Sequence, residues 1–478
     1  MANILARNAE LLAATALVFV YLALMNGHMQ SIDGLLTYRQ AHSILYAGSL
    51  QLDPPIWWGQ WWTTSKFGIG LSLLYLPGLV VFSWLRPGVP IPEGAVYDFR
   101  LLYADPLYAV AAAPVQIIAT AASAFLVALV LRELGYSRRI AIFGLAVYGL
   151  ASPALVYARG DVTQPLTALC WIGGLYAVLR FRRRGERWAL AAGGAAVFYA
   201  VLTRPLEGTL LFLGLAVLLA PFPLRPWRIS RWLNVGVVCT AYGAAGMVTL
   251  LINWGRSGSP FATGYEGTGW TTPLPIGLVG SLISPGRGLL WEFPIVVLVP
   301  LGVRVLWREG RRIEAFVFGG LAVVELLNVA TWEAWWGGWG WGLRLFVPAL
   351  PLLAAMAAIG MTVLPTRARF WLPAILFFGG VIWAVPAVVT DLLGGYASAY
   401  DGTGPSFAWH AYPPFGAWRF LHHIRATSLT DSGAVDILWI RLAHATHNLS
   451  LIPGLAFATV AVLLGRRVYQ LARRRDEG

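Results

Sequence analysis

Asp33 and Asp161 are the residues of this 478-residue chain best suited to acid–base chemistry, because each lies in a polar segment beside a long apolar stretch. A carboxylate at the mouth of a membrane helix costs free energy when it is desolvated and unpaired, so it is a candidate functional residue. A local role is equally consistent with the residue types. Asp33 precedes Gly34 in a common turn pair, and Asp161 could cap a helix that has Pro165 in its first turn.

A second set of residues is suited to binding an anion. Arg287 and Arg344 lie in glycine-rich segments, where a chain turns sharply or approaches a neighbour closely. We expect both on the external side of a membrane, against the usual placement of basic residues. An arginine at a helix mouth suits a phosphate, to which it donates two parallel hydrogen bonds. Lys66 is also notable, because it is the only lysine among 35 basic residues.

The elements that must position these residues are membrane helices. The chain is 58% hydrophobic and 12% charged, which is about half the charged share of a soluble domain. Apolar stretches of about 20 residues, the length that crosses a bilayer, recur along it. The pattern predicts an all-α polytopic membrane protein, a single domain over 1–478, with about 12–13 membrane helices. The expected spans are 9–27, 67–85, 107–131, 140–157, 166–182, 188–203, 206–221, 234–252, 291–306, 315–331, 343–362, 370–390 and 451–467.

Arginine clusters predict the orientation, because basic residues accumulate on the cytoplasmic side. The clusters at 132–139, 180–187, 225–231, 308–312, 367–369 and 466–475 all fall on one side. The segments expected outside are a helical first loop at 28–66, then 158–165, 204–205, 253–290, 332–342 and a last loop at 391–450. We therefore expect a multi-pass protein of the plasma (inner) membrane with its site on the extracytoplasmic side. Because Arg7 favours an internal N-terminus, one early stretch should not cross, and 67–85 is the preferred candidate.

Several other classes are disfavoured by the composition. The net charge of +13 does not indicate nucleic-acid binding, because the basic residues occur at helix ends. Cys170 and Cys239 lie inside apolar stretches and are expected to be packing residues without a disulfide. The first apolar run, 11–25, has no convincing cleavage site, so we interpret it as a retained span.

Tryptophan and histidine each leave two interpretations open. Tryptophans cluster at 57–62 and 332–341, where they suit either the aromatic belt of a membrane or stacking against a sugar, with Trp335 as the candidate. All seven histidines are expected outside. His444 and His447 have a spacing that allows a divalent metal site, although surface histidines have the same spacing.

The order of the polar loops resembles the GT-C superfamily of membrane glycosyltransferases, which use polyprenyl-phosphate-linked sugars. It is similar in particular to bacterial proteins described as dolichyl-phosphate-mannose-protein mannosyltransferase-like. The matching segments are Asp33-Gly34, Ser65 to Gly70, Tyr157 to Leu166, Leu202 to Pro205, Asn253 to Tyr265 with Ser284 to Leu290, and Trp332 to Pro351. Two positions depart from the family pattern. Gly34 stands where a second acidic residue is frequent, and Gln164 stands where Glu often precedes Pro.

The resemblance implies that Asp33 is the general base of an inverting sugar transfer to an acceptor hydroxyl. It implies that the donor is a polyprenyl-phosphate-linked sugar and that the acceptor is a lipid, glycan or protein. The residues that would hold the lipid phosphate are Lys66, Arg204, Arg287 and Arg344. Asp161 or Glu266 would orient the acceptor, and Arg39 and Trp335 are further substrate-binding candidates.

Two alternative functions remain open at the level of sequence. A transporter or flippase for a lipid-linked sugar should carry ionisable residues at mid-membrane, and the sequence offers few: Glu325 is the clearest, and Glu207 lies near the end of a span. A second alternative, within enzymes, is an oligosaccharide polymerase or ligase.

Overall fold

The computed structural model describes residues 9–53, 55–57, 61–85, 111–220, 229–285, 287–338, 340–390, 435–443 and 446–473. The helices before the first long gap are α2 (Ala9–Ala23), α3 (Ile32–His42), the π-helix η1 (Ser43–Ala47) and α4 (Gly70–Leu85). The next are α7 (Ala113–Glu133), α8 (Arg138–Leu150), α9 (Ala154–Tyr157), α10 (Gln164–Arg184), α11 (Arg187–Thr203), α12 (Pro205–Leu219) and α13 (Ile229–Ser257). The remainder are α14 (Leu274–Ile283), α15 (Leu289–Glu292), η2 (Pro294–Leu298), α16 (Val299–Arg308), α17 (Arg312–Thr331), η3 (Arg344–Ala349), α18 (Leu350–Gly360), η4 (Met361–Val363), α19 (Thr366–Val389), α21 (Leu438–Arg441) and α22 (Leu451–Arg473).

The expected all-α membrane architecture is confirmed. Within the described ranges, six helices are long and apolar enough to cross a bilayer, and five shorter apolar helices of 10–17 residues accompany them. The expected span at 291–306 is not one helix. Its residues form α15, η2 and α16 in succession, because Pro294 and Pro300 lack the N–H groups that a continuous helix would need at these positions.

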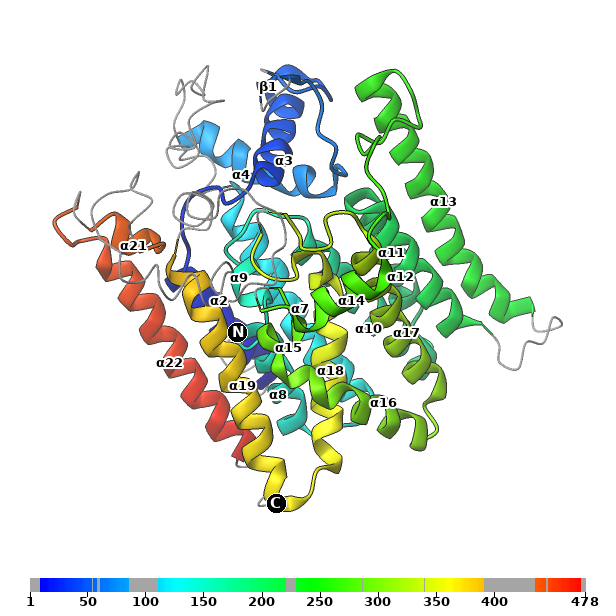
Figure 1. Ribbon diagram of the computed structural model, residues 1–478, viewed down its shortest axis with the longest axis vertical. Helices are drawn as coiled ribbons and strands as arrows, with labels where there is room; N and C mark the ends of the chain where they lie inside the picture. The colour runs from blue at the N-terminus through cyan, green and yellow to red at the C-terminus, as the bar shows by residue number, and fades with distance from the viewer. Residues whose placement is uncertain are drawn as a thin grey trace.

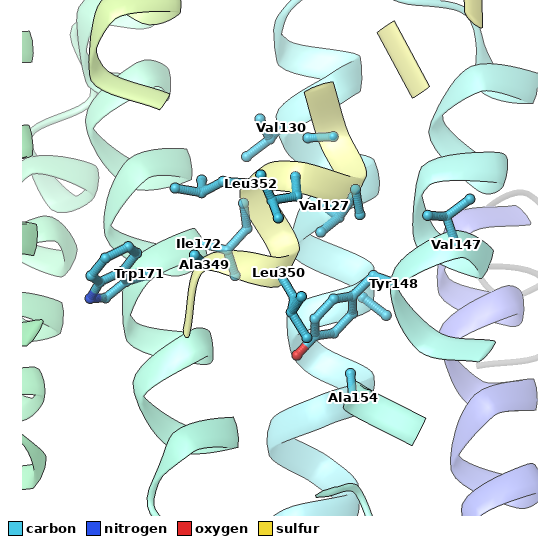
Figure 2. Packing of buried hydrophobic residues seen from close by; sticks show 14 of the residues in the cluster. Val127, Val130, Val147, Tyr148, Ala154, Trp171, Ile172, Ala349, Leu350 and Leu352 are labelled. Carbon is cyan, nitrogen blue, oxygen red and sulfur yellow. The ribbon is translucent and has the colours of Figure 1, made fainter. Parts of the chain in front are cut away.

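The helix α18 is the centre of the bundle, and every one of its residues is buried. Its four alanines, Ala354, Ala355, Ala357 and Ala358, leave room for close neighbours on all sides. Figure 2 shows the start of this helix between α7, α8 and α10, which contribute Val127 and Val130, Val147 and Tyr148, and Trp171 and Ile172 to the same buried cluster. A helix that is apolar all round is stable only where it is enclosed by protein or lipid. Because η3 leads directly into α18, the residues of η3 are held in place by a fully buried helix.

The region predicted to be the first external loop forms, together with α4, a layer at one end of the bundle, named the external layer for its predicted side (Figure 1). There α3 packs against α4 around a small core that includes Leu36, Leu71 and Tyr75. In addition to the expected helix, the region contains a two-stranded antiparallel hairpin, β1 (Ile56–Trp57) and β2 (Trp61–Trp62). The turn between α18 and α19 lies at the opposite end of the bundle (Figure 1). The 16-residue α4 contains Pro77 and is among the shorter apolar helices, which is consistent with the preferred assignment of 67–85 as a stretch that does not cross.

The C-terminal helix α22 packs along α2, the first described helix of the chain (Figure 1). The segment before it is anchored to the end of α2, where the indole of Trp439 donates to the carbonyl of Leu22 at 2.8 Å. Most of the expected last external loop, 391–434, lies outside the described residues.

Candidate functional site

Asp33 lies in the first turn of α3, close to the partly positive N-terminus of that helix. It is not the cap of the helix, because Ser31 holds that position and its Oγ accepts a hydrogen bond from the Gly34 N–H at 2.9 Å. The Asp33 carboxylate is instead paired with Arg344, with Oδ2 and Nη1 2.9 Å apart. Both side chains keep some exposure, 18% and 12%, so the pair lies at the edge of the protein interior. A free carboxylate edge beside a guanidinium suits both proton abstraction and anion binding.

Asp161 is fully buried and bonds to the segment that precedes Asp33. One carboxylate oxygen accepts from the backbone N–H groups of Gln30 at 2.8 Å and Ser31 at 3.1 Å. The other accepts from the Ser31 hydroxyl at 2.7 Å. The sequence interpretation of Asp161 as a helix cap is therefore wrong. The N-cap of α10 is Thr163, and Asp161 joins two loops that are distant in sequence.

The contact with Asp161 explains why a glycine follows Asp33. A Cβ atom added to Gly34 would lie 2.1 Å from the carboxyl carbon of Asp161, a separation that real atoms do not adopt. The space beside Asp33 that a second acidic side chain at position 34 would use is thus occupied by a carboxylate from another loop. The site holds two carboxylates even though the adjacent acidic pair of the resembling family is absent.

Burial raises the pKa of Asp161 to about 6, although its bonds from Ser31 and Gln30 oppose the shift. The folded protein therefore holds the proton more tightly than the unfolded chain, whose Asp has its ordinary value of 3.8. Stability from this group is fully present below pH 4 and is lost as the pH rises through about 6. Ionisation at pH 7 costs roughly 3 kcal/mol of folding free energy.

Asp161→Asn is accordingly expected to unfold at a higher temperature than the wild type at pH 7.5. The difference should disappear at pH 4. Near-UV circular dichroism of the detergent-solubilised proteins at both pH values measures it. Asp53→Asn, at an exposed carboxylate of the same external layer, serves as the control and should match the wild type at pH 7.5. An Asp161→Asn midpoint below that of the wild type at pH 7.5 would contradict the cost assigned to the buried charge.

A glycine-rich loop positions Arg344. The Tyr157 hydroxyl donates to the Trp341 carbonyl at 2.5 Å, and Glu292 accepts from the Leu343 N–H at 3.0 Å. Gly340 lies against the Arg344 side chain, since a Cβ there would be 2.6 Å from its Cδ. The loop is therefore in close contact with the Arg344 side chain. Arg344 is the first residue of η3, which leads directly into the enclosed helix α18.

Arg287 holds the same loop from the other side. It donates to the carbonyls of Gly338 at 3.2 Å, Gly340 and Gly342 at 3.2 Å, and it is 5% exposed. These bonds assign Arg287 to the support of the Arg344 loop. We predicted that Arg287 holds a phosphate. Its described hydrogen bonds go to the glycine loop, whereas Arg344 is the arginine that pairs with Asp33.

Lys66 is enclosed by three aromatic rings. Its Nζ atom lies 5.2 Å from the ring centre of Trp62, 5.5 Å from that of Phe67 and 5.4 Å from that of Tyr265. Ring faces attract a cation, and they do not neutralise its charge. No carboxylate among the described residues forms an ion pair with Lys66, so its charge stays available to an anion.

Tyr265 lies next to Lys66, and the charges of the Asp33–Arg344 pair act on it. Burial raises the pKa of Tyr265 to about 12, and the charges that act on its hydroxyl are those of Arg204, Asp33, Glu207 and Arg344. Its ring also forms edge contacts with Phe67 and Trp332. The charges of the predicted residues Asp33, Arg204 and Arg344 thus all act on one tyrosine, whose ring lies 5.4 Å from Lys66 Nζ.

The other predicted residues lie around this group with different surroundings. Arg204 is paired with Glu207 on α12 and lies 3.5 Å from the Thr163 hydroxyl. Glu266 is exposed and accepts from the backbone of Thr263 and Gly264, which closes its own turn. Arg39 is buried on α3. The Trp335 ring packs on α14, where a Cβ on Gly280 would meet it at 2.2 Å.

Arg256 is a basic residue near the site that the sequence interpretation did not single out. It is buried at the end of α13 and donates from Nη1 to the Phe67 carbonyl at 2.9 Å. Its Nε and Nη2 atoms have no hydrogen-bond partner among the described residues. The sequence could have indicated Arg256, because it lies in the segment 253–290, which is predicted to be external, and an arginine there goes against the orientation rule.

The described residues contain no group of three or more His, Cys, Asp or Glu side chains arranged to hold a metal ion. His447 is exposed, whereas His444, the other half of the predicted pair, lies outside the described residues together with His410, His422 and His423. The possible divalent metal therefore stays a prediction.

No protein-family model matches this sequence, and no curated protein matches it. Solved structures do resemble the fold. ArnT from Cupriavidus metallidurans bound to undecaprenyl phosphate matches with a TM-score of 0.51 and 16% identity, over 97% of this chain and 76% of that chain. The apo state of the same protein matches at 0.49 and 18% over the same shares. The archaeal oligosaccharyltransferase AglB from Archaeoglobus fulgidus, in complex with an inhibitory peptide and a dolichol-phosphate, matches at 0.46 and 11%, over 85% of this chain and 59% of that chain. The likeness to the lipid-bound ArnT structure shows that the chain has the GT-C type of membrane fold.

Proposed function

We propose that the chain is a membrane glycosyltransferase that moves a sugar from a polyprenyl-phosphate donor to an acceptor hydroxyl at the external membrane face. The observation that carries the proposal is the pairing of Asp33 with Arg344 at 2.9 Å. The charges of both act on Tyr265, whose ring is one of the three around Lys66, a lysine that no described carboxylate neutralises. Lipid-phosphate sugar transfer needs a base and fixed cations near one another. A solved structure that matches with a TM-score of 0.51 is that of ArnT bound to undecaprenyl phosphate.

In the proposed reaction Asp33 takes the proton of the acceptor hydroxyl. The acceptor oxygen forms a bond to the anomeric carbon as the bond from that carbon to the phosphate oxygen breaks. The electron pair of the broken bond stays on the polyprenyl phosphate, which leaves, and a single displacement inverts the anomeric centre. A positioned base of this kind contributes about 10²- to 10⁴-fold in rate.

The cations have a separate role, because the phosphate gains negative charge as the sugar leaves. Fixed cations in a water-poor site stabilise such charge without reorganising at the moment of reaction. Lys66 supplies one charge from its aromatic enclosure, and Arg344 supplies another next to the base. Arg256, with two nitrogens that donate to no described atom, is a third candidate for the same phosphate. The order of strength among them depends on where the lipid headgroup lies.

The function is tested with the purified protein in detergent, given a polyprenyl-phosphate sugar labelled in the sugar and a lipid, glycan or peptide acceptor. The expected result is release of free polyprenyl phosphate in a one-to-one ratio with glycosylated product of inverted anomeric configuration. Transfer of one sugar per donor separates this reaction from that of a polymerase or ligase, which moves an assembled chain. Passage of the intact lipid-linked sugar across a reconstituted vesicle, without product, would refute the enzyme and support a flippase.

A further inference from the structure

The C-terminal segment 435–443 carries a buried carboxylate, Asp436, that the proposed reaction does not use. It is 0% exposed. It accepts hydrogen bonds from Arg159 Nη2 at 2.5 Å and Arg441 Nη2 at 2.8 Å, and it lies 2.5 Å from His28 Nε2. Burial alone would raise the pKa of Asp436, but His28 and Arg159 hold it well below its usual range. An ionised carboxylate therefore joins three segments that are far apart in sequence.

Two of these segments are the ones that meet next to Asp33. His28 comes two residues before Gln30, and Arg159 comes two residues before Asp161. The Gln30 N–H donates to Asp161 at 2.8 Å, so the two segments contact each other directly. They are joined a second time through Asp436. The pair of connections fixes both the separation and the orientation of the segments, whereas one connection alone would allow rotation.

The C-terminal segment is itself held firmly. The Asp436 N–H donates to the Val389 carbonyl at the end of α19 at 2.9 Å. The Leu438 N–H donates to the Met25 carbonyl at 2.7 Å, just after α2. Arg159 adds bonds to the Asp436 and Val388 carbonyls. The Asp436 segment thus links α2 and α19 to the 28–31 and 159–161 segments, which lie next to the helix that carries the proposed base.

We propose that Asp436 is a positioning residue for the proposed sugar transfer: through His28 and Arg159 it holds the 28–31 and 159–161 segments so that Asp33 faces Arg344. The inference rests on the proposed function for the role of Asp33. Asp436 touches neither substrate nor Asp33 in this arrangement. Its effect reaches the base through Ser31, which caps α3 and bonds to Asp161.

The variant that tests the proposal most cleanly is His28→Phe. It removes one bond to Asp436 and leaves Asp436 paired with Arg159 and Arg441, so no arginine loses its carboxylate. Amide hydrogen exchange of the peptide over 28–36 is expected to accelerate about tenfold or more, because this segment loses one of its two connections. In steady-state transfer, kcat is expected to fall by about 10- to 100-fold, with the donor KM unchanged within about twofold.

Asp436→Asn extends the test, because it removes the charge and leaves one acceptor oxygen in place of two, so that the NH2 group of the amide faces either Arg159 or His28 and Arg441. Two buried arginines lose their carboxylate in this variant, so both effects should be larger than those of His28→Phe. The control is Glu133→Gln, which removes a carboxylate that is also buried, with 8% exposure, and lies 3.1 Å from Arg184 in the end predicted to be cytoplasmic. The control should leave exchange over 28–36 and kcat as in the wild type.

The outcomes separate the inference from the proposed function. Wild-type exchange over 28–36 in both His28→Phe and Asp436→Asn would overturn the positioning role, whether or not the protein transfers sugar. Faster exchange with an unchanged kcat, or a raised donor KM alone, would overturn it as well. Faster exchange in a protein whose wild type transfers no sugar would refute the proposed function and leave the connection through Asp436 intact.

Discussion

Replacing Asp33 with asparagine is expected to reduce sugar transfer by about 10²- to 10⁴-fold, the contribution of a positioned general base. The amide has nearly the same shape and can still accept a hydrogen bond from Arg344, which is 2.9 Å away. The cap of α3 is unaffected, because it is formed by Ser31. The variant should therefore fold and insert normally, and its kcat should fall while its KM for the donor does not rise. Arg344 is no longer neutralised in this variant, so the binding of phosphate is not weakened.

The measurement is the turnover number of the purified variant with saturating polyprenyl-phosphate sugar and acceptor. Asp53→Asn is the matched control, since Asp53 is an exposed carboxylate in the same external layer. Its turnover should equal that of the wild type within about twofold, because a solvent-exposed charge contributes little at a distance. A turnover number of Asp33→Asn equal to that of the control would remove the general-base mechanism.

The second large effect is expected at Lys66. Lys66→Gln removes the charge and leaves the rings of Trp62, Phe67 and Tyr265 in place. A hydrogen bond to a charged group contributes roughly 1.5–3 kcal/mol, which corresponds to a loss of about 10- to 150-fold in kcat/KM for the donor. Inhibition by free undecaprenyl phosphate should weaken by a similar factor, because the free lipid presents the same phosphate without the sugar. Lys66→Arg keeps the charge and should recover part of the loss.

A cation over an aromatic ring also exists at the opposite end of the bundle, which provides a control for Lys66. The guanidinium of Arg312 lies 5.7 Å from the ring centre of Trp307. Arg312→Gln should leave donor kinetics and lipid inhibition unchanged, since this pair lies on the cytoplasmic side in the expected orientation. If Lys66→Gln is inhibited by undecaprenyl phosphate as strongly as the wild type, the lysine does not bind the phosphate.

The membrane architecture was predictable, because it depends on properties that are written locally in the chain. A run of about 20 apolar residues buries its own backbone hydrogen bonds in a helix whatever its neighbours are. The prediction of one continuous span over 291–306 was wrong, and the prolines that interrupt it, Pro294 and Pro300, were visible in the sequence. The buried polar contacts have no such local signature, since they depend on which helix ends meet.

The candidate site shows the same division. Sequence by itself predicted that Asp33, Lys66 and Arg344 lie on one side of the membrane, because helix length and arginine placement predict the side of each loop. Only the tertiary structure decided that Arg344 pairs with Asp33, that Asp161 bonds to Gln30 and Ser31 instead of capping α10, and that Arg287 supports the glycine loop. The physical reason is that hydrogen bonds and ion pairs require partners within about 3 Å. That distance is set by helix packing over the whole chain, not by spacing along it.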